Sequence, residues 1–311
     1  MPILVATQLP ETPPGVPWPT RVNEMPLVSF TDPAGLRTVF SDWENGWVLQ
    51  PGAKGLDMPQ YAFTQDESPG IDGYEIRQVR AQGKEIALPI AFWADDSRAA
   101  YLARRRGLIR SLNPKRGTGT LTVTQADGTS RTIGARYSAG LEGDESLDAA
   151  GARWCINVLT FACPKPFWLG AEVTTEWRAA VAGTFFPILP LVVGNSQVLG
   201  SVTVDNDGDD DAFPVWTITG PATSVSLTNV TTGEVLVLNR TVTIGDTIVI
   251  DTRERQQTAL LNGTTNLWGD LSDASTMWVL EPGLNDLTLT VAGSTSNTRV
   301  RMTYQPRYLA A

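Results

Sequence analysis

Alternation of apolar and polar residues is the dominant pattern along this chain, and such alternation predicts β-strands. The clearest case is segment 84–93, where every second residue is a large apolar one. Pro89 inside it indicates an edge strand or a bulge, because proline cannot donate a hydrogen bond to a neighbouring strand. Other predicted strands lie at residues 27–30, 38–40, 74–80, 119–125, 130–137 and 153–162, whereas residues 41–73 are expected to be loop-rich.

One segment, from about Asp96 to Leu112, has the apolar period of a helix instead. Asp95 or Asp96 is expected to cap its first turn, because a carboxylate accepts the free amide hydrogens there. Asn113-Pro114 ends it, since the residue before proline is biased away from the helical region.

From residue 201 onward the chain alternates short strands with turns about every ten residues. The predicted strands are 201–204, 215–218, 225–228, 234–238, 247–250, 276–280, 287–291 and 298–304. This spacing, without a helix, predicts a β-sandwich or jelly roll. The predicted divisions are a Pro-rich arm at 1–25, a β-rich domain at 26–168, a connecting arm at 169–200 and a second β domain at 201–311.

The composition supports a globular chain with unusually few charges. Its 311 residues are 42% hydrophobic and 18% charged, and a chain that buries surface against neighbours needs fewer solvated charges. The net charge of −9 argues against general nucleic-acid binding, which requires clustered Lys and Arg. No apolar run is long enough to cross a membrane and residues 1–20 lack the signal-peptide pattern, so we expect synthesis in a cytoplasm and no membrane insertion.

The chain has no histidine, which excludes Ser-His-Asp catalysis, His-based zinc sites and imidazole pH switches. Its two cysteines, Cys155 and Cys163, are eight residues apart in one extended segment, too far for a disulfide unless the chain turns back. We expect two buried, reduced thiols, and no catalytic, cofactor or metal site.

A basic cluster stands out in this acidic chain. Seven cations lie on and just after the predicted helix with no acid between them: Arg98, Arg104, Arg105, Arg106, Arg110, Lys115 and Arg116. The functional interpretation is a face that docks an acidic partner surface or lies near nucleic acid, although no aromatic side chains interleave with the arginines for base stacking. The alternative is a solvated face balanced in space by acids elsewhere, such as Glu142, Asp144, Glu145 and Asp148.

An acidic loop spans Asp205 to Asp211 and holds five carboxylates. A calcium loop of the EF-hand type needs glycine at its sixth position and glutamate at its twelfth, and this loop fails both tests. A looser calcium site stays open, beside the simpler interpretation of a solvated turn.

Three tryptophans of the second domain, Trp216, Trp268 and Trp278, suggest sugar stacking as one interpretation. Trp216 and Trp278 fall inside strand patterns, which favours packing in the core. Trp268 lies in the turn-rich stretch 262–273 and is the better candidate for an exposed ring that contacts a glycan.

The order of the motifs resembles one known family. Ser111-Leu112-Asn113-Pro114 ends the helix, and Thr160-Phe161-Ala162-Cys163-Pro164-Lys165-Pro166-Phe167-Trp168 ends the last strand of the first domain. Further matches are residues 206–208, 213–220, 229–233, 245–252, 281–285 and 304–308. Over roughly residues 25–311 this pattern is similar to that of the distal tail proteins of long-tailed, non-contractile phages.

The resemblance implies a mainly β fold, with an N-terminal ring domain carrying one α-helix and a C-terminal galectin-like sandwich. It further implies a structural virion protein at the tail tip, forming a homo-oligomer, expected to be a hexameric ring. Its expected partners are the tail tube protein, the tail-tip or baseplate hub protein and other minor tail proteins, with DNA only passing through the channel. Receptor-binding parts would be supported by the sandwich.

Two alternatives belong to other classes of function. The second domain would be a carbohydrate-binding module if Trp268 contacts host-surface glycans. A glycan hydrolase with paired carboxylates is conceivable because acids are present, but no spacing singles out a pair.

Overall fold

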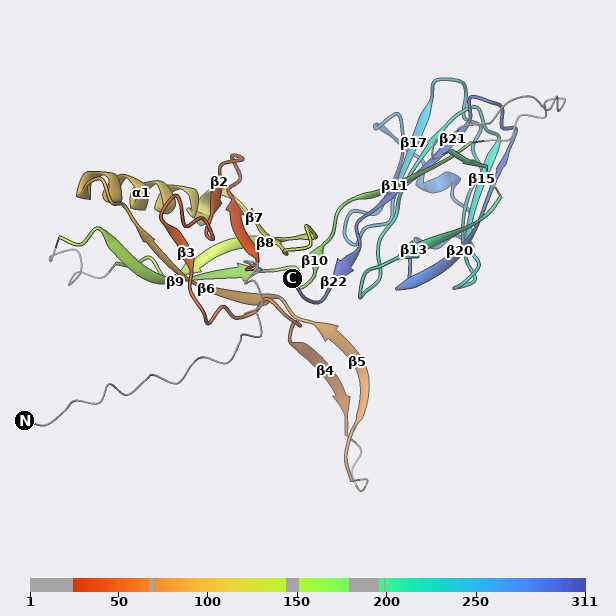
Figure 1. The fold of residues 1–311 in the computed structure, drawn as a ribbon. Coiled ribbons are helices and arrows are strands. Elements are labelled where there is room, and N and C mark those ends of the chain that lie inside the picture. The colour runs from red at the N-terminus through yellow and green to blue at the C-terminus, as the bar shows by residue number, and fades with distance from the viewer. Residues whose placement is uncertain (1–24, 68–69, 71, 144–150, 179–195, 199) are drawn as a thin grey trace, which may run out of the picture.

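The computed structural model describes residues 25–67, 70, 72–143, 151–178, 196–198 and 200–311. Figure 1 shows two lobes joined by a narrow waist, with a hairpin projecting from the first lobe. The buried hydrophobic residues form two separate clusters, one in each lobe, so each lobe has a core of its own.

The first domain is a curved sheet closed by a helix. Its elements are β1 (Leu27–Thr31), β2 (Arg37–Val39), β3 (Trp47–Leu49), β4 (Tyr61–Asp66), β5 (Glu75–Ala81), β6 (Lys84–Trp93), α1 (Arg98–Ser111), a 3₁₀ turn (Pro114–Arg116), β7 (Gly119–Thr124), β8 (Ser130–Ala139), β9 (Trp154–Cys163) and β10 (Trp168–Leu169). The strand order across the sheet is β2-β1-β7-β8-β9-β6-β3.

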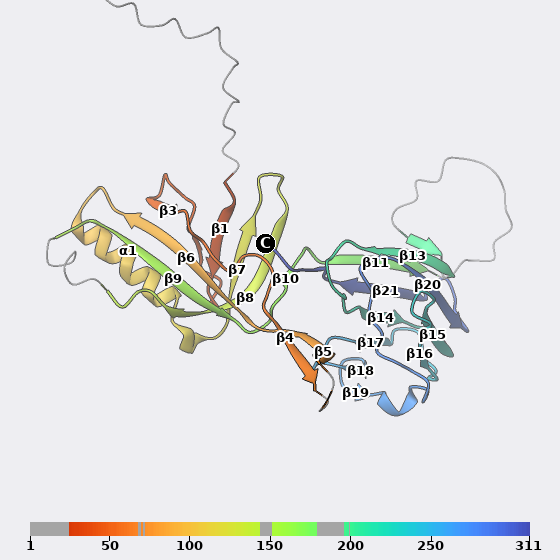
Figure 2. The same ribbon diagram turned by 90° about the horizontal axis from the view of Figure 1, so that it is seen from below.

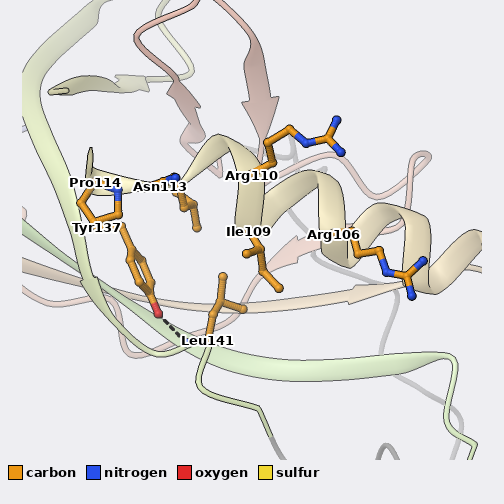
Figure 3. A pocket seen from close by; sticks show the side chains of 8 residues that line it. Arg106, Ile109, Arg110, Asn113, Pro114, Tyr137 and Leu141 are labelled. Atoms are coloured by element: carbon orange, nitrogen blue, oxygen red, sulfur yellow. Dashed lines mark hydrogen bonds between the residues drawn. The ribbon is translucent and has the colours of Figure 1, made fainter. Parts of the chain in front are cut away.

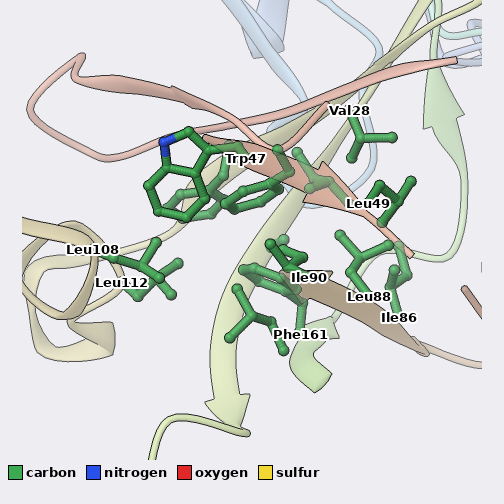
Figure 4. Packing of buried hydrophobic residues seen from close by; sticks show 14 of the residues in the cluster. Val28, Trp47, Leu49, Ile86, Leu88, Ile90, Leu108, Leu112 and Phe161 are labelled. Carbon is green, nitrogen blue, oxygen red and sulfur yellow. The ribbon is translucent and has the colours of Figure 1, made fainter. Parts of the chain in front are cut away.

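The core of this domain lies between the inner face of the sheet and α1, as Figure 4 shows. The inward residues of β6, such as Ile86 and Leu88, are fully buried and meet Phe161 of β9 and Leu108 of the helix in one cluster. The period-2 pattern of β6 thus places one face in the core, and it leaves the other face of the sheet outside.

Pro89 lies where the pairing of β6 with the edge strand β3 ends. The β3 ladder stops at the pair Leu49–Ile90, and the carbonyl of Pro89 accepts the next hydrogen bond, from the Gln50 amide at 2.7 Å. In a strand, the N–H and C=O of one residue point to the same side. The N–H that Pro89 lacks would therefore point past the end of β3, where it interrupts no ladder.

The second domain is a sandwich of two antiparallel sheets, apart from one parallel pair, that of β11 and β12. Its strands are β11 (Val173–Arg178), β12 (Ser196–Val198), β13 (Ser201–Asn206), β14 (Val215–Thr219), β15 (Ser224–Asn229), β16 (Glu234–Leu238), β17 (Thr247–Asp251), β18 (Thr258–Leu261), β19 (Thr265–Asn266), β20 (Gly283–Ala292) and β21 (Arg299–Tyr304). One sheet runs β12-β11-β21-β14-β17-β18-β19 and the other β13-β20-β15-β16. Figure 2 shows the two sheets around their shared core.

The final strand, β22 (Arg307–Tyr308), leaves the second domain and pairs with β10 of the first. Two antiparallel crossings therefore connect the lobes, one entering at β10–β11 and one returning at β21–β22. The predicted connecting arm, residues 169–200, contains β11, which pairs along its whole length with β21 of the sandwich. The predicted domain boundaries stay a prediction, and this pairing favours starting the second domain at Val173.

The predicted fold class is confirmed: the chain is mainly β, with α1 in the first domain and a sandwich in the second. The predicted helix cap was wrong, because Ser97 caps α1 by accepting the Ala100 amide at 3.1 Å. Ser97 is as good a cap former as the aspartates before it, so sequence alone could not choose.

The predicted loop-rich segment 41–73 also contains two short strands, β3 and β4, whose apolar alternation is hidden among glycines and prolines. The strand predicted at residues 276–280 was wrong. Within the described residues, segment 276–280 forms one isolated bridge, Leu280 to Ala212, and contributes the buried Trp278 to the core.

Candidate interaction surfaces

Helix α1 lies against the sheet through Tyr101 and Leu108, which are both buried. The helix also carries most of the basic cluster predicted from the sequence. The structure brings five of the seven cations together on this one helix, and it places Lys115 and Arg116 in the 3₁₀ turn that follows.

Several of these cations are used within the chain. Arg98 donates to the Ala152 carbonyl at 2.7 Å. Arg104 donates to the Trp93 carbonyl and lies over the Trp47 ring, a position that depends on the absence of a side chain at Gly46. These side chains hold the helix onto the sheet, so they are structural ones.

Arg116 is tied less tightly, with its guanidinium 4.0 Å from the buried carboxylate of Asp32. Arg105 also has contacts within the chain. Among the seven predicted cations, Arg106, Arg110 and Lys115 remain as exposed side chains with no side-chain hydrogen bond or ion pair to the described residues.

Arg106 and Arg110 border a pocket of about 400 Å³ beside the C-terminal half of α1, here called the helix pocket. Its other lining residues are Ile109, Leu112, Asn113, Pro114, Tyr137 and Leu141. Figure 3 shows Ile109 and Leu141 pointing toward one another across it. The pocket combines an apolar floor with two guanidinium groups, which suits an acidic and partly apolar segment of a partner.

The floor of the helix pocket is fixed by Tyr137, whose hydroxyl accepts the Leu141 amide at 2.8 Å. Burial raises the pKa of Tyr137, so its phenol stays neutral at physiological pH. Of the acids considered as internal counter-charges, Glu142 instead accepts the Gly140 amide at 2.9 Å, and Asp144, Glu145 and Asp148 lie outside the described residues.

The acidic loop has a different role from either predicted one. Asp210 forms a 2.5 Å ion pair with Arg307, and Asp209 accepts the Leu309 amide at 3.0 Å. Burial, followed by repulsion from Asp210, raises the pKa of Asp211. The loop is therefore neither a free turn nor, within the described residues, part of a cluster fit for a metal ion; it holds the C-terminal segment.

The C-terminal segment, residues 307–311, is bound on both sides of the waist. The Arg307 guanidinium lies over the rings of Phe167 and Phe213, 4.0 and 5.0 Å from their centroids. The Tyr308 ring packs under Arg131 at 3.8 Å, and the Ala311 amide donates to the first domain at 3.0 Å. The waist is thus held by specific contacts of the C-terminal segment, which sequence reasoning missed because the partners are more than 90 residues apart.

The three tryptophans are buried or exposed as predicted. Trp216 and Trp278 are buried and pack edge to face at 5.4 Å, and Trp177 joins them from β11. Trp268 is 48% exposed in a 3₁₀ turn of the second domain. Its ring is therefore accessible to a ligand.

Cys155 and Cys163 are both buried thiols that form no disulfide with each other, as predicted. Burial raises the pKa of the Cys163 thiol to about 11, so it stays protonated and unreactive at neutral pH. Within the described part of the chain no helix has the length and apolar character to span a bilayer.

Comparison with known proteins supports the resemblance seen in the sequence. Residues 207–308 match the model of the family described as siphovirus-type tail component, C-terminal domain. No curated protein matches the chain.

Among solved structures, the SPP1 Dit protein, described as a paradigm of the hub adsorption apparatus in phages that infect Gram-positive bacteria, has a TM-score of 0.63 and 16% identity. The match covers 90% of this chain and 98% of that one. Two structures of the phage p2 baseplate in its activated conformation, with Ca and with Sr, match over the same shares at 12% identity and a TM-score of 0.47, too distant to carry an argument. The predicted resemblance to distal tail proteins is confirmed, by the family model for the second domain and by the shared fold for the whole chain.

Proposed function

We propose that this chain is a structural, non-catalytic subunit of a ring at the tip of a phage tail, where it joins the tail tube to the tail-tip hub. The observation that carries the proposal is the fold shared with SPP1 Dit across both domains, together with the family match of the second. In the virion the second domain would project from the ring and support the receptor-binding parts. The subunit would be made in the host cytoplasm and assembled there.

The distribution of exposed apolar side chains over the molecule supports this role. The first domain exposes large apolar side chains on its sheet and on its hairpin, whereas monomeric proteins rarely leave contiguous apolar patches uncovered. A closed ring covers such surfaces on every subunit, since each one contacts two neighbours.

The experiment is light scattering and negative-stain imaging of the purified full chain, alone and with its tail tube protein. We expect a closed ring, with six subunits, and a central hole wide enough for DNA. A chain that stays monomeric at high concentration even with the tube protein present would contradict the proposal.

We further propose that the helix pocket and its two exposed arginines meet an acidic surface of the adjacent tail tube ring. Of the cations predicted for this contact, Arg106 and Arg110 are free to make it, whereas Arg98 and Arg104 serve the chain's own fold. The double variant Arg106→Glu/Arg110→Glu should still form rings but bind the tube protein at least about tenfold more weakly. The matched control is Arg255→Glu, an exposed cation of the second domain; equal binding by both variants would count against the contact.

Glycan recognition by the second domain is the second candidate, favoured by the exposed ring of Trp268. A glycan array probed with the full chain and with Trp268→Ala tests it. Signal that is lost in the variant supports a carbohydrate-binding role, and a blank array for the wild type removes it.

A further inference from the structure

The outer face of the first domain's sheet is apolar where β6 and β9 pair. The paired residues on this face are Trp93 with Trp154, Ala91 with Ile156 and Pro89 with Val158. Trp154, Ile156 and Val158 of β9 are between 50% and 54% exposed, and this stretch of β9 pairs with β6 alone, because its pairing with β8 starts only at Thr160. We call this surface the β6–β9 face.

The β6–β9 face is also hollowed at one end. Trp43, which is 71% exposed, packs edge-on against Trp93 with 5.0 Å between centroids. Together with Trp154 and Ile156 they border a depression of about 470 Å³. Nothing in the described chain fills it, so three indole rings stand around an open, largely apolar surface.

The β4–β5 hairpin has an apolar face of its own. Phe63 of β4 pairs with Val79 of β5, and a register shift then sets Ile76 opposite Gln65, on the same face as Phe63. All three apolar side chains are just over half exposed. The opposite face is polar and carries Thr64, paired with Gln78.

The hairpin cannot cover this face with its own chain. Only Gln82 and Gly83 separate β5 from β6, and Gly83 lies against the backbone of Cys163, so the hairpin continues outward from the end of the sheet. Figure 1 shows it projecting away from both lobes. An isolated two-stranded hairpin is marginally stable in water, and this one buries almost none of its strand residues.

We propose that the apolar face of the β4–β5 hairpin packs on the β6–β9 face of a second copy of this chain. The two surfaces are alike in size, since Tyr61–Gln65 and Trp154–Val158 each span about 13 Å at the rise of a strand. Each copy carries both surfaces, and neither has a partner within the described chain.

The contact is heterologous, because one surface of a copy meets a different surface of the next. Such head-to-tail contacts close into a ring when the rotation between copies allows it. The inference rests on the proposed ring and deepens it, since it names the two surfaces that would join neighbouring subunits.

The test uses two single variants of the full chain, Val79→Asp on the hairpin and Ile156→Asp on the β6–β9 face. Both positions are exposed, so circular dichroism should show an unchanged fold while light scattering shows loss of the wild-type oligomer. Thr64→Asp, on the polar face of the same hairpin, and Ile244→Asp, an exposed apolar position of the second domain, should assemble as the wild type does.

Mixing the two defective variants makes the test specific. The intact hairpin of Ile156→Asp can still bind the intact face of Val79→Asp, so the mixture should form 1:1 dimers and nothing larger. If both variants assemble like the wild type, or if the mixture stays monomeric, the inference is overturned while the proposed ring stands. A wild type that never assembles counts against the ring itself.

Discussion

The two domains differ in how many large apolar side chains they leave exposed and in where these side chains lie. Of the seventeen large apolar side chains that are exposed in the described residues, thirteen lie in the first domain and four in the second. Those of the second domain are scattered over separate turns and strands, whereas seven of the thirteen in the first lie on or beside the β6–β9 face and on the β4–β5 hairpin: Trp43, Trp154, Ile156, Val158, Phe63, Ile76 and Val79. The described part of the second domain therefore leaves no gathered apolar surface, whereas the first leaves two, as the proposed ring requires.

The same difference shows in the placement of aromatic rings. Trp216 in the second domain is fully buried between Trp177 and Trp278. Trp154 in the first domain is half exposed on a sheet face. Identical side chains thus contribute to folding in one domain and are available for association in the other.

The largest effect should come from the core of the second domain. Trp216→Ala removes a buried ring and should lower the free energy of unfolding by about 3–5 kcal/mol. Trp216→Phe should cost much less, because the Trp216 indole N–H has no hydrogen-bond partner to lose among the described residues. Urea unfolding followed by circular dichroism measures both.

The control for this prediction is Trp154→Ala, measured on monomeric protein. It should change the free energy of unfolding by no more than about 0.5 kcal/mol, as exposed positions usually do. Equal losses at both positions would mean that the two domains do not differ in the way described.

The next largest effect should come from the joint between the domains. Arg307→Ala removes the ion pair with Asp210 and the ring contacts with Phe167 and Phe213, which should cost about 1–3 kcal/mol. Hydrogen exchange should then rise in β10 and β22 while the sandwich core stays protected. Unchanged exchange in those two strands would show that the joint does not depend on Arg307.

A smaller effect is expected in the sheet of the sandwich that contains β11 and β21. Hydrogen bonds from Arg301, and then from Arg178 and Arg299, lower the pKa of Glu176. A carboxyl whose pKa is lowered by folding stabilises the protein above its unfolded pKa, and this stabilisation is lost as the pH falls through the folded pKa. Glu176→Gln should therefore cost up to about 1 kcal/mol at pH 7 and progressively less below about pH 4.

Chemical unfolding of Glu176→Gln and the wild type across this pH range is the measurement. The difference should also shrink in high salt, because these side chains are partly exposed. A difference that grows toward acid pH would reverse the assigned sign and contradict the prediction.

Local patterns in the sequence predicted most strands, because alternation reports which face of a strand is buried. Segment 84–93 was predicted with its observed bounds, and so was the strand 234–238. The turn at Asp127-Gly128, between the predicted strands 119–125 and 130–137, is also held locally, with Asp127 accepting the Thr129 amide at 2.8 Å. These features depend on neighbours in the chain, which sequence patterns record.

Features that depend on distant partners could not be predicted in this way. The acidic loop looked like a solvated turn because Arg307, its counter-charge, is almost a hundred residues away. The basic cluster looked uniform, although Arg104 turns inward to Trp93 and Arg106 stays outside. Only the folded backbone decides which charges face each other.

The return of residues 307–311 to the first domain has a consequence for biosynthesis. Translation proceeds from the N-terminus, so the ribosome makes the whole sandwich before it makes the strand that pairs with Trp168 and Leu169. The first domain is thus among the first parts synthesised and the last to be finished. A nascent chain that is interrupted anywhere in the sandwich would lack β22, so β10 of its first domain would have no partner there. Its first domain would therefore be incomplete before the chain could join a neighbouring copy.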